Sequence, residues 1–128
     1  MGTLLIVDDE ADVREFAANF FKKRKIDVTT ASSGEEALEK IGKQRPSLVL
    51  LDIKMAGIDG IETLRRIKAI DSGIKVVMVT GRKPEDEDSF EQCRRLGANE
   101  YVHKPLELDE LEQIVLKQLV EDSAGVTK

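Results

Sequence analysis

Four consecutive aliphatic residues, 48–51, run directly into an aspartate, Asp52. An unbroken apolar run of this length is typical of a strand that is buried on both faces, and such strands lie in the middle of parallel sheets. In open α/β sheets, ligands bind outside the carboxyl ends of the strands. The position of Asp52 at the end of this strand therefore predicts a functional site around its carboxylate.

The rest of the chain alternates strand-like and helix-like segments. Apolar, β-rich runs predict strands at residues 3–7, 26–31, 48–52, 76–79 and 99–103. Apolar residues at three- and four-residue spacing predict a helix after each strand, through residues 11–24, 37–41, 61–70, 90–96 and 108–119. Because strands that alternate with helices form parallel sheets with right-handed crossovers, we predict an α/β fold with a three-layer (βα)5 architecture.

Length and composition narrow the class of protein. The chain of 128 residues suffices for one domain, which we place at residues 1–121, followed by a polar C-terminal tail at 122–128 that we expect to fray. A single cysteine, Cys93, excludes an internal disulfide, is typical of the cytoplasm, and lies on an apolar stripe that predicts a core position. No apolar run reaches the ~18 residues of a membrane helix. A net charge of −5 without a basic stripe argues against direct nucleic-acid binding.

Polar residues follow four of the five predicted strands. They are Asp8 and Asp9 after the first strand, Asp52 after the third, Thr80 after the fourth and Lys104 after the fifth. Since the carboxyl ends of parallel strands meet at one edge of the sheet, we expect these side chains to converge. Carboxylates so close together remain ionised only beside a cation, and a few oxygen ligands suit Mg²⁺. The pattern therefore predicts a magnesium site, with Lys104 placed to offset the charge of an incoming anion.

Asp52 differs from the other acids because it stands alone on the central strand. An ionised carboxylate there can act as a nucleophile toward phosphorus and form an acyl phosphate. Simpler interpretations exist for each residue taken singly. Asp8 and Asp9 can cap the helix that follows them, and Thr80 and Lys104 can be ordinary strand-end residues.

Two other functions of a similar fold fit the sequence less well. A phosphatase with an aspartyl nucleophile usually carries a second acid two residues after the nucleophile, where this chain has Lys54. A flavin-binding protein would need small hydroxyl and glycine residues after the first strand to hold the flavin phosphate. The acidic run at residues 8–10 would instead repel that phosphate.

Five short motifs occur in a fixed order along residues 3 to about 120. They are Leu5-Ile6-Val7-Asp8-Asp9-Glu10, the Asp52 strand with Met55 and Asp59-Gly60, Val79-Thr80-Gly81, Gly97-Ala98, and Tyr101-Val102-His103-Lys104-Pro105. With these motifs at this spacing, the sequence resembles the CheY-like receiver domain of bacterial two-component response regulators. The resemblance implies a flavodoxin-like fold whose five-stranded parallel sheet has the order 2-1-3-4-5.

The resemblance also implies roles for the site residues. Asp52 would accept a phosphoryl group from a histidine kinase or a phosphotransfer protein. Asp9, Asp52 and the backbone carbonyl of Lys54 would bind Mg²⁺, and Asp8 would act mainly through water. Lys104 would pair with the phosphoryl group. The chain would catalyse only its own phosphorylation and dephosphorylation, so we expect no separate enzymatic activity.

A switch is implied in the same way. Thr80 would hydrogen-bond a phosphoryl oxygen, Tyr101 would turn inward behind it, and the bond before Pro105 would be cis. The output would be a population shift on the face formed by the fourth helix, fifth strand and fifth helix, read by an effector domain or protein. That face is also a candidate for homodimer contacts. His103 shares strand parity with Tyr101, and we predict a surface position for it.

The sequence departs from the family pattern close to Asp52. Residue 56, usually proline after Met55, is alanine, and we expect this change to loosen the loop beside Asp52. Lys54 and Arg82 lie two residues beyond Asp52 and Thr80, where they flank the path of an attacking water. We therefore predict slow self-dephosphorylation.

Overall fold

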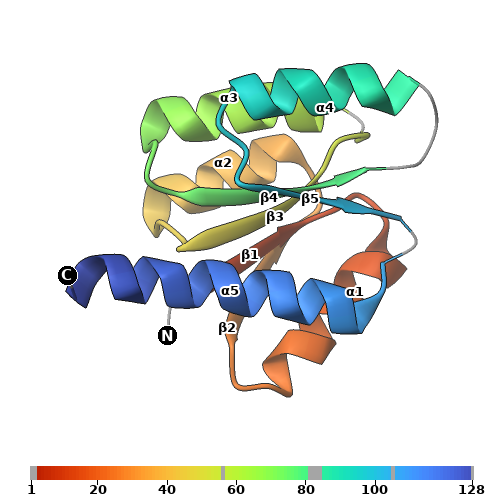
Figure 1. Ribbon diagram of the computed structural model, residues 1–128. Coiled ribbons are helices and arrows are strands. Elements are labelled where there is room, and N and C mark those ends of the chain that lie inside the picture. Colours follow the sequence, from red (N-terminus) through yellow and green to blue (C-terminus); the bar gives the residue numbers. More distant parts are fainter. Residues whose placement is uncertain (1–2, 56, 81–84, 105, 128) are drawn as a thin grey trace.

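Five parallel strands form the middle layer of the protein (Figure 1). The computed structural model describes residues 3–55, 57–80, 85–104 and 106–127. The strands are β1 (Thr3–Val7), β2 (Asp27–Ala31), β3 (Leu48–Asp52), β4 (Lys75–Thr80) and β5 (Glu100–His103). They pair in the order β2-β1-β3-β4-β5. This confirms the expected order and places β3, which carries Asp52, in the centre.

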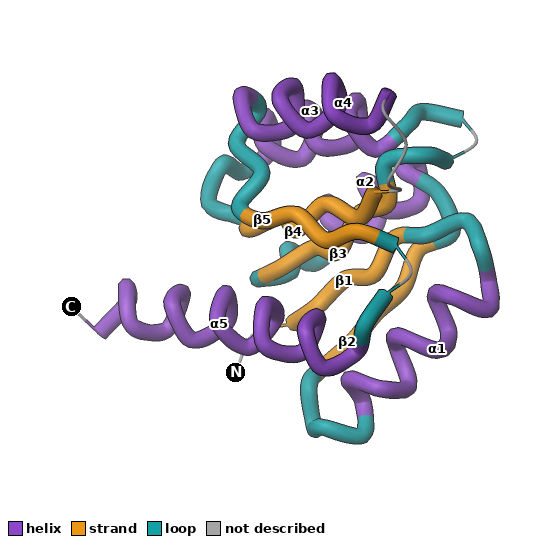
Figure 2. Tube along the Cα trace, turned by 45° about the vertical axis from the view of Figure 1, so that its right-hand side comes forward, coloured by secondary structure: helices purple, strands orange, loops and turns teal. Residues whose placement is uncertain are grey.

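Helices cover both faces of this sheet. They are α1 (Ala11–Lys22), α2 (Gly34–Lys43), α3 (Gly60–Ile70), α4 (Glu85–Arg95) and α5 (Leu108–Thr127). The two views show α1 and α5 on one face and α2, α3 and α4 on the other (Figures 1 and 2). The three-layer α/β prediction is therefore confirmed. Among the described residues, no helix is both long enough and apolar enough to cross a membrane.

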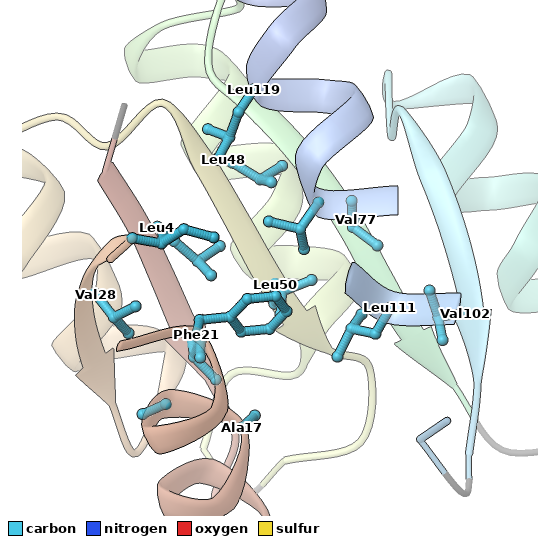
Figure 3. Close-up of a cluster of buried hydrophobic side chains, with 14 residues drawn as sticks. Leu4, Ala17, Phe21, Val28, Leu48, Leu50, Val77, Val102, Leu111 and Leu119 are labelled. Carbon is cyan, nitrogen blue, oxygen red and sulfur yellow. The ribbon is translucent and has the colours of Figure 1, made fainter. Parts of the chain in front are cut away.

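Strand β3 contributes to both hydrophobic cores, and all five of its residues are buried. Leu48 and Leu50 belong to the cluster under α1 and α5, where Leu50 lies near the ring of Phe21 (Figure 3). Val49 and Leu51 belong to the cluster under α2, α3 and α4. Alternate residues of a strand point to opposite faces of the sheet, so a strand covered on both faces must be apolar throughout. This explains the unbroken run before Asp52.

Side-chain caps fix the starts of two helices. The hydroxyl of Ser33 accepts a hydrogen bond from the Glu36 backbone N–H at 3.0 Å, which caps α2. The Glu36 carboxylate returns to the backbone N–H of Ser32, at 2.7 Å, one residue earlier than in the usual capping box. The carboxylate of Asp59 accepts from the Glu62 N–H at 2.9 Å and caps α3.

Three of the helices add detail to the sequence-based expectations. Helix α5 continues to Thr127, beyond the residues whose spacing predicted it, and includes most of the segment that we expect to fray; that segment contains no proline that would end the helix. Phe16 in α1 is 63% exposed, because Ala17 and Phe21 occupy the buried side of this helix. Cys93 is fully buried, as predicted for a core residue.

Candidate functional site

The carboxyl ends of β1 and β3 bring two aspartates together. Ile6 and Leu50 are register partners in these neighbouring strands, and both belong to the cluster under α1 and α5. Asp8 and Asp52 come two residues later, so strand alternation sends their side chains toward the same side of the sheet edge. Both residues are only 4% exposed. The sequence-based expectation that these two acids converge is confirmed.

Lys104, which follows β5, supplies the positive charge at this edge. Its Nζ lies 3.1 Å from Oδ2 of Asp52 and 3.3 Å from Oε1 of Glu10. Oδ2 of Asp8 is 3.7 Å away. The Lys104 backbone N–H donates to the carbonyl of Thr80 at 2.7 Å, which fixes the start of the lysine side chain beside the end of β4. One ammonium therefore contacts three carboxylates.

Burial and mutual repulsion act on the protonation of these groups. Burial, with the nearby Asp8 charge as the second cause, raises the pKa of Asp52 from 3.8 to about 6, although Lys104 acts in the opposite direction. Burial also raises the pKa of Asp8, against a hydrogen bond from the Glu10 N–H. Burial lowers the pKa of Lys104, but its hydrogen bond to Asp52 and the surrounding carboxylates outweigh this and raise it overall. The site thus carries more negative charge than one ammonium can offset.

Three carboxylates at this edge could hold a metal ion. Oxygens of Asp8, Glu10 and Asp52 all lie within 4.8 Å of one another. A small set of hard oxygen ligands, two of them buried, fits the preference of Mg²⁺ for oxygen. Glu10 was not among the predicted ligands, whereas Asp9, which was, is exposed and outside this group. The role of Asp9 stays a prediction.

The capping interpretation of the acidic run is only partly supported. The residue at the cap position of α1 is Glu10, and its side chain makes no capping hydrogen bond. Asp8 accepts a hydrogen bond from the Glu10 N–H at 2.9 Å, which orients its carboxylate beside the helix start. The sequence signal for the place of Glu10 in the site was its position at a predicted helix start, directly after two aspartates.

The loop after Asp52 is held close to its carboxylate. The backbone N–H of Lys54 donates to Oδ1 of Asp52 at 3.3 Å. Gly60, the first residue of α3, donates from its N–H to the carbonyl of Ile53 at 2.7 Å. A Cβ added at Gly60 would lie 2.2 Å from the Asp52 carbonyl oxygen, so only glycine allows α3 to begin against this backbone. The carbonyl of Lys54 stays a predicted ligand.

Thr80 and Tyr101 lie on the other side of the sheet edge. Thr80 is 2% exposed, and its buried Oγ1 has no hydrogen-bond partner among the described residues. Tyr101 packs with its hydroxyl buried against the cluster that contains Cys93. Burial raises the pKa of the Cys93 thiol, and a hydrogen bond with Tyr101 acts in the opposite direction. Tyr101 thus lies inward in this structure, and its switching role stays a prediction.

The remaining sequence predictions have mixed outcomes. His103 is exposed, as expected, with its ring centroid 6.3 Å from that of Tyr101. Arg82, Ala56 and the predicted cis bond before Pro105 fall on residues outside those that the structure describes.

Comparison with known families shows which family this chain belongs to. The model of the response regulator receiver domain matches residues 4–116, nearly all of the chain. The chain belongs to this family. The receiver domain is the module of two-component response regulators, so the family assignment agrees with the resemblance seen in the motifs. The acidic group with its lysine is at the carboxyl edge of the receiver sheet.

Individual relatives support the same assignment. The chain is 39% identical over 116 residues to sporulation initiation phosphotransferase F of Bacillus subtilis, covering 91% of this chain and 92% of that protein. It is 42% identical to a protein-glutamate methylesterase/protein-glutamine glutaminase of Bacillus licheniformis, covering 82% of this chain but 30% of that protein. The match therefore covers most of the first relative and under a third of the second. No activity of the longer protein follows for this chain.

Solved structures share the fold over the whole receiver. A CheY-like receiver domain protein from Methanospirillum hungatei has a TM-score of 0.89 at 27% identity, with 98% of both chains covered. NtrX from Brucella abortus has a TM-score of 0.89 at 29% identity, covering 98% of this chain and 28% of that one. The receiver therefore occurs both as most of a solved chain and as one part of a longer one.

Proposed function

We propose that this receiver is a phosphorylation-dependent switch whose phosphoacceptor is Asp52. The observation that carries the proposal is the contact between Lys104 and Asp52 inside a group of acids at the end of the central strand. A buried carboxylate with one oxygen on an ammonium and the other on a backbone N–H has a fixed orientation. Fixed orientation of a nucleophile is a large part of the catalysis of phosphoryl transfer.

The donor is the phosphohistidine of a histidine kinase or phosphotransfer protein. An oxygen of Asp52 attacks phosphorus, the new O–P bond forms, and the P–N bond breaks with its electron pair passing to the imidazole nitrogen. Lys104, whose Nζ is 3.1 Å from the attacking carboxylate, pairs with the charge on the arriving phosphoryl oxygens. A Mg²⁺ ion held by Asp8, Asp52 and Glu10 or Asp9, with the carbonyl of Lys54, would neutralise phosphoryl charge when bound.

The output uses the side of the sheet edge that holds Thr80 and Tyr101. The buried hydroxyl of Thr80, which has no partner in the part of the chain that the structure describes, can donate its hydrogen bond to a phosphoryl oxygen. Tyr101, in β5, then reports the change on the α4-β5-α5 face, where an effector domain, a partner protein or a second copy of the chain binds. The chain changes only its own phosphorylation state and acts in the cytoplasm, which the free buried thiol of Cys93 supports.

A small-molecule donor tests this function without knowledge of the kinase. Acetyl phosphate with Mg²⁺ should add one phosphoryl group to the protein, detected by intact mass. The modification should disappear in Asp52→Ala and persist in the control Asp27→Ala, because Asp27 is an exposed residue of β2. Absence of any modification of the wild-type protein in acetyl phosphate, together with no response to beryllofluoride, would refute the switch. Continuous turnover of phosphoesters would favour a phosphatase instead.

A further inference from the structure

The loop between β3 and α3 lies beside Asp52 and is held at both ends. At its start, the Lys54 N–H donates to the Asp52 carboxylate. At its end, Asp59 caps α3 and the Gly60 N–H donates to the carbonyl of Ile53. These bonds leave the middle of the loop to be positioned by something outside it. Gly57 and Ile58, in this middle part, lie three and four residues beyond Lys54, so holding them limits the positions open to the Lys54 backbone.

Glu35, in the first turn of α2, contacts this middle part directly. Its Oε2 accepts a hydrogen bond from the Ile58 backbone N–H at 3.2 Å. Its carboxylate also lies against Gly57, where an added Cβ would come within 2.7 Å of Oε2 and 3.0 Å of Oε1. Gly57 has a φ of +78°, a conformation that other residues adopt only with strain. Both features fit a glycine kept for the close approach of the Glu35 carboxylate.

The residue before Glu35 supports the same loop. A Cβ added at Gly34 would lie 2.7 Å from Cγ1 of Ile58, so the side chain of Ile58 rests directly on the backbone of Gly34. Ile58 is therefore held twice by the start of α2, through its N–H and through its side chain. The sequence also lacks a proline at position 56, so the chain itself restricts this loop less. The contacts of Ile58 with the start of α2 are a restriction on this loop that the structure shows.

We infer that Glu35 is a positioning residue for the site at Asp52: its carboxylate holds the middle of the β3–α3 loop and thereby fixes the Lys54 backbone beside Asp52. This inference rests on the proposed phosphoryl-transfer function. Glu35 touches neither Asp52 nor the acidic group, so it acts through the loop and not on the reacting atoms. A hydrogen bond to an ionised carboxylate is stronger than one between neutral groups, and this one is exposed to solvent.

Glu35 has a second effect that the experiment must separate from this one. A negative charge in the first turn of a helix interacts favourably with the helix dipole, which would stabilise α2 without positioning the loop. Glu35→Gln removes that charge but keeps a side-chain oxygen that can accept from the Ile58 N–H. Glu35→Ala removes both. Glu39→Ala is the matched control, because Glu39 is an exposed glutamate one turn later whose partner is Lys43.

The test measures loop order and metal dependence in the same three variants and the wild type. Hydrogen exchange followed by mass spectrometry reports the amides of residues 57–60, and acetyl phosphate labelling at increasing Mg²⁺ gives the half-saturating Mg²⁺ concentration and the maximal rate. Urea unfolding checks that each variant is folded. In Glu35→Ala we expect faster exchange at Ile58 and a half-saturating Mg²⁺ concentration roughly 3- to 10-fold higher. Glu35→Gln should lie near the wild type, and Glu39→Ala should equal it.

Three other results would each contradict one part of this inference. If Glu35→Ala matches Glu39→Ala in exchange and in Mg²⁺ dependence, the positioning role is wrong. If Glu35→Gln is as impaired as Glu35→Ala, charge at the helix start explains the effect and the hydrogen bond does not. If wild-type protein takes no phosphoryl group at any Mg²⁺ concentration, the proposed function fails, and the inference that rests on it fails too. Exchange at Ile58 then shows separately whether the Glu35 contact exists.

Discussion

The buried carboxylate of Asp52 makes the stability of this protein depend on pH in a direction that can be tested. Its pKa is raised from 3.8 to about 6, with burial as the main cause and Asp8 as the second. The folded protein therefore binds this proton more tightly than the unfolded chain does. The resulting stabilisation is complete below about pH 4 and is lost as the pH rises through about 6. Above that pH, the folded state contains a buried charge that opposes folding.

Asp52→Asn removes this charge while keeping the size of the side chain. The difference between a pKa of 3.8 and one of about 6 corresponds to about 3 kcal/mol. The amide loses part of the attraction to Lys104, so we expect the variant to gain about 1–3 kcal/mol in free energy of unfolding at pH 7.5. Most of the gain should vanish at pH 4.5. Urea unfolding in EDTA, followed by far-UV circular dichroism, measures both values.

Asp27→Asn is the control for the loss of any carboxylate, because Asp27 is exposed. The free energy of unfolding of this variant should stay within about 0.5 kcal/mol of the wild-type value at both pH values. The reasoning is refuted if Asp52→Asn is no more stable than the wild type at pH 7.5. It is refuted equally if the variant differs from the wild type by the same amount at both pH values, because a titrating charge cannot produce a constant difference.

Three more experiments test the surroundings of the site. Gly60→Ala should lower the free energy of unfolding by about 1–3 kcal/mol, because its Cβ would lie 2.2 Å from the carbonyl that ends β3. Gly42→Ala is the control, because a Cβ added at Gly42 would have nothing within 4 Å, and this variant should be neutral or stabilising. Equal urea midpoints for Gly60→Ala and Gly42→Ala would contradict the steric argument. Thr80→Val should keep or raise the urea midpoint, because it removes a buried hydroxyl that has no partner among the described residues. A clear decrease in the urea midpoint would show that the hydroxyl is hydrogen-bonded. Combined Lys54→Asn and Arg82→Glu should speed the decay of the phosphorylated protein after removal of donor, and an unchanged decay rate would end the hypothesis of obstructed water.

The residues themselves were sufficient to predict the alternation of strands and helices, because runs and spacings of apolar residues reflect which faces of each element are buried. The strand at residues 48–52 is apolar throughout because helices cover it on both sides, and the structure confirms that all five residues are buried. The strand order came from the family resemblance and not from the residues themselves. The length of α5 was missed because a polar segment without proline is compatible with either helix or coil.

The site was predictable where backbone geometry determines it. Strand ends place Asp8, Asp52 and Lys104, and these three meet as expected. Glu10 was missed because its side chain reaches Lys104 through its own conformation, which strand alternation does not determine. The contact between Glu35 and Ile58 joins residues 23 apart in the sequence and depends on a positive φ in the loop. No local pattern encodes such a contact.

Lys104 connects the two sides of the sheet edge, and this gives the proposed switch a short physical route. Its ammonium contacts the Asp52 carboxylate, and its backbone N–H donates to the carbonyl of Thr80 at 2.7 Å. Strand β4 is also bonded to the residue that follows Asp52, because the Ile53 N–H donates to the carbonyl of Val79 at 3.0 Å. A new charge on Asp52 would thus change the forces on a residue whose backbone is bonded to Thr80. The response needs no long pathway, because consecutive contacts along one sheet edge join the Asp52 carboxylate, Lys104 and the backbone of Thr80.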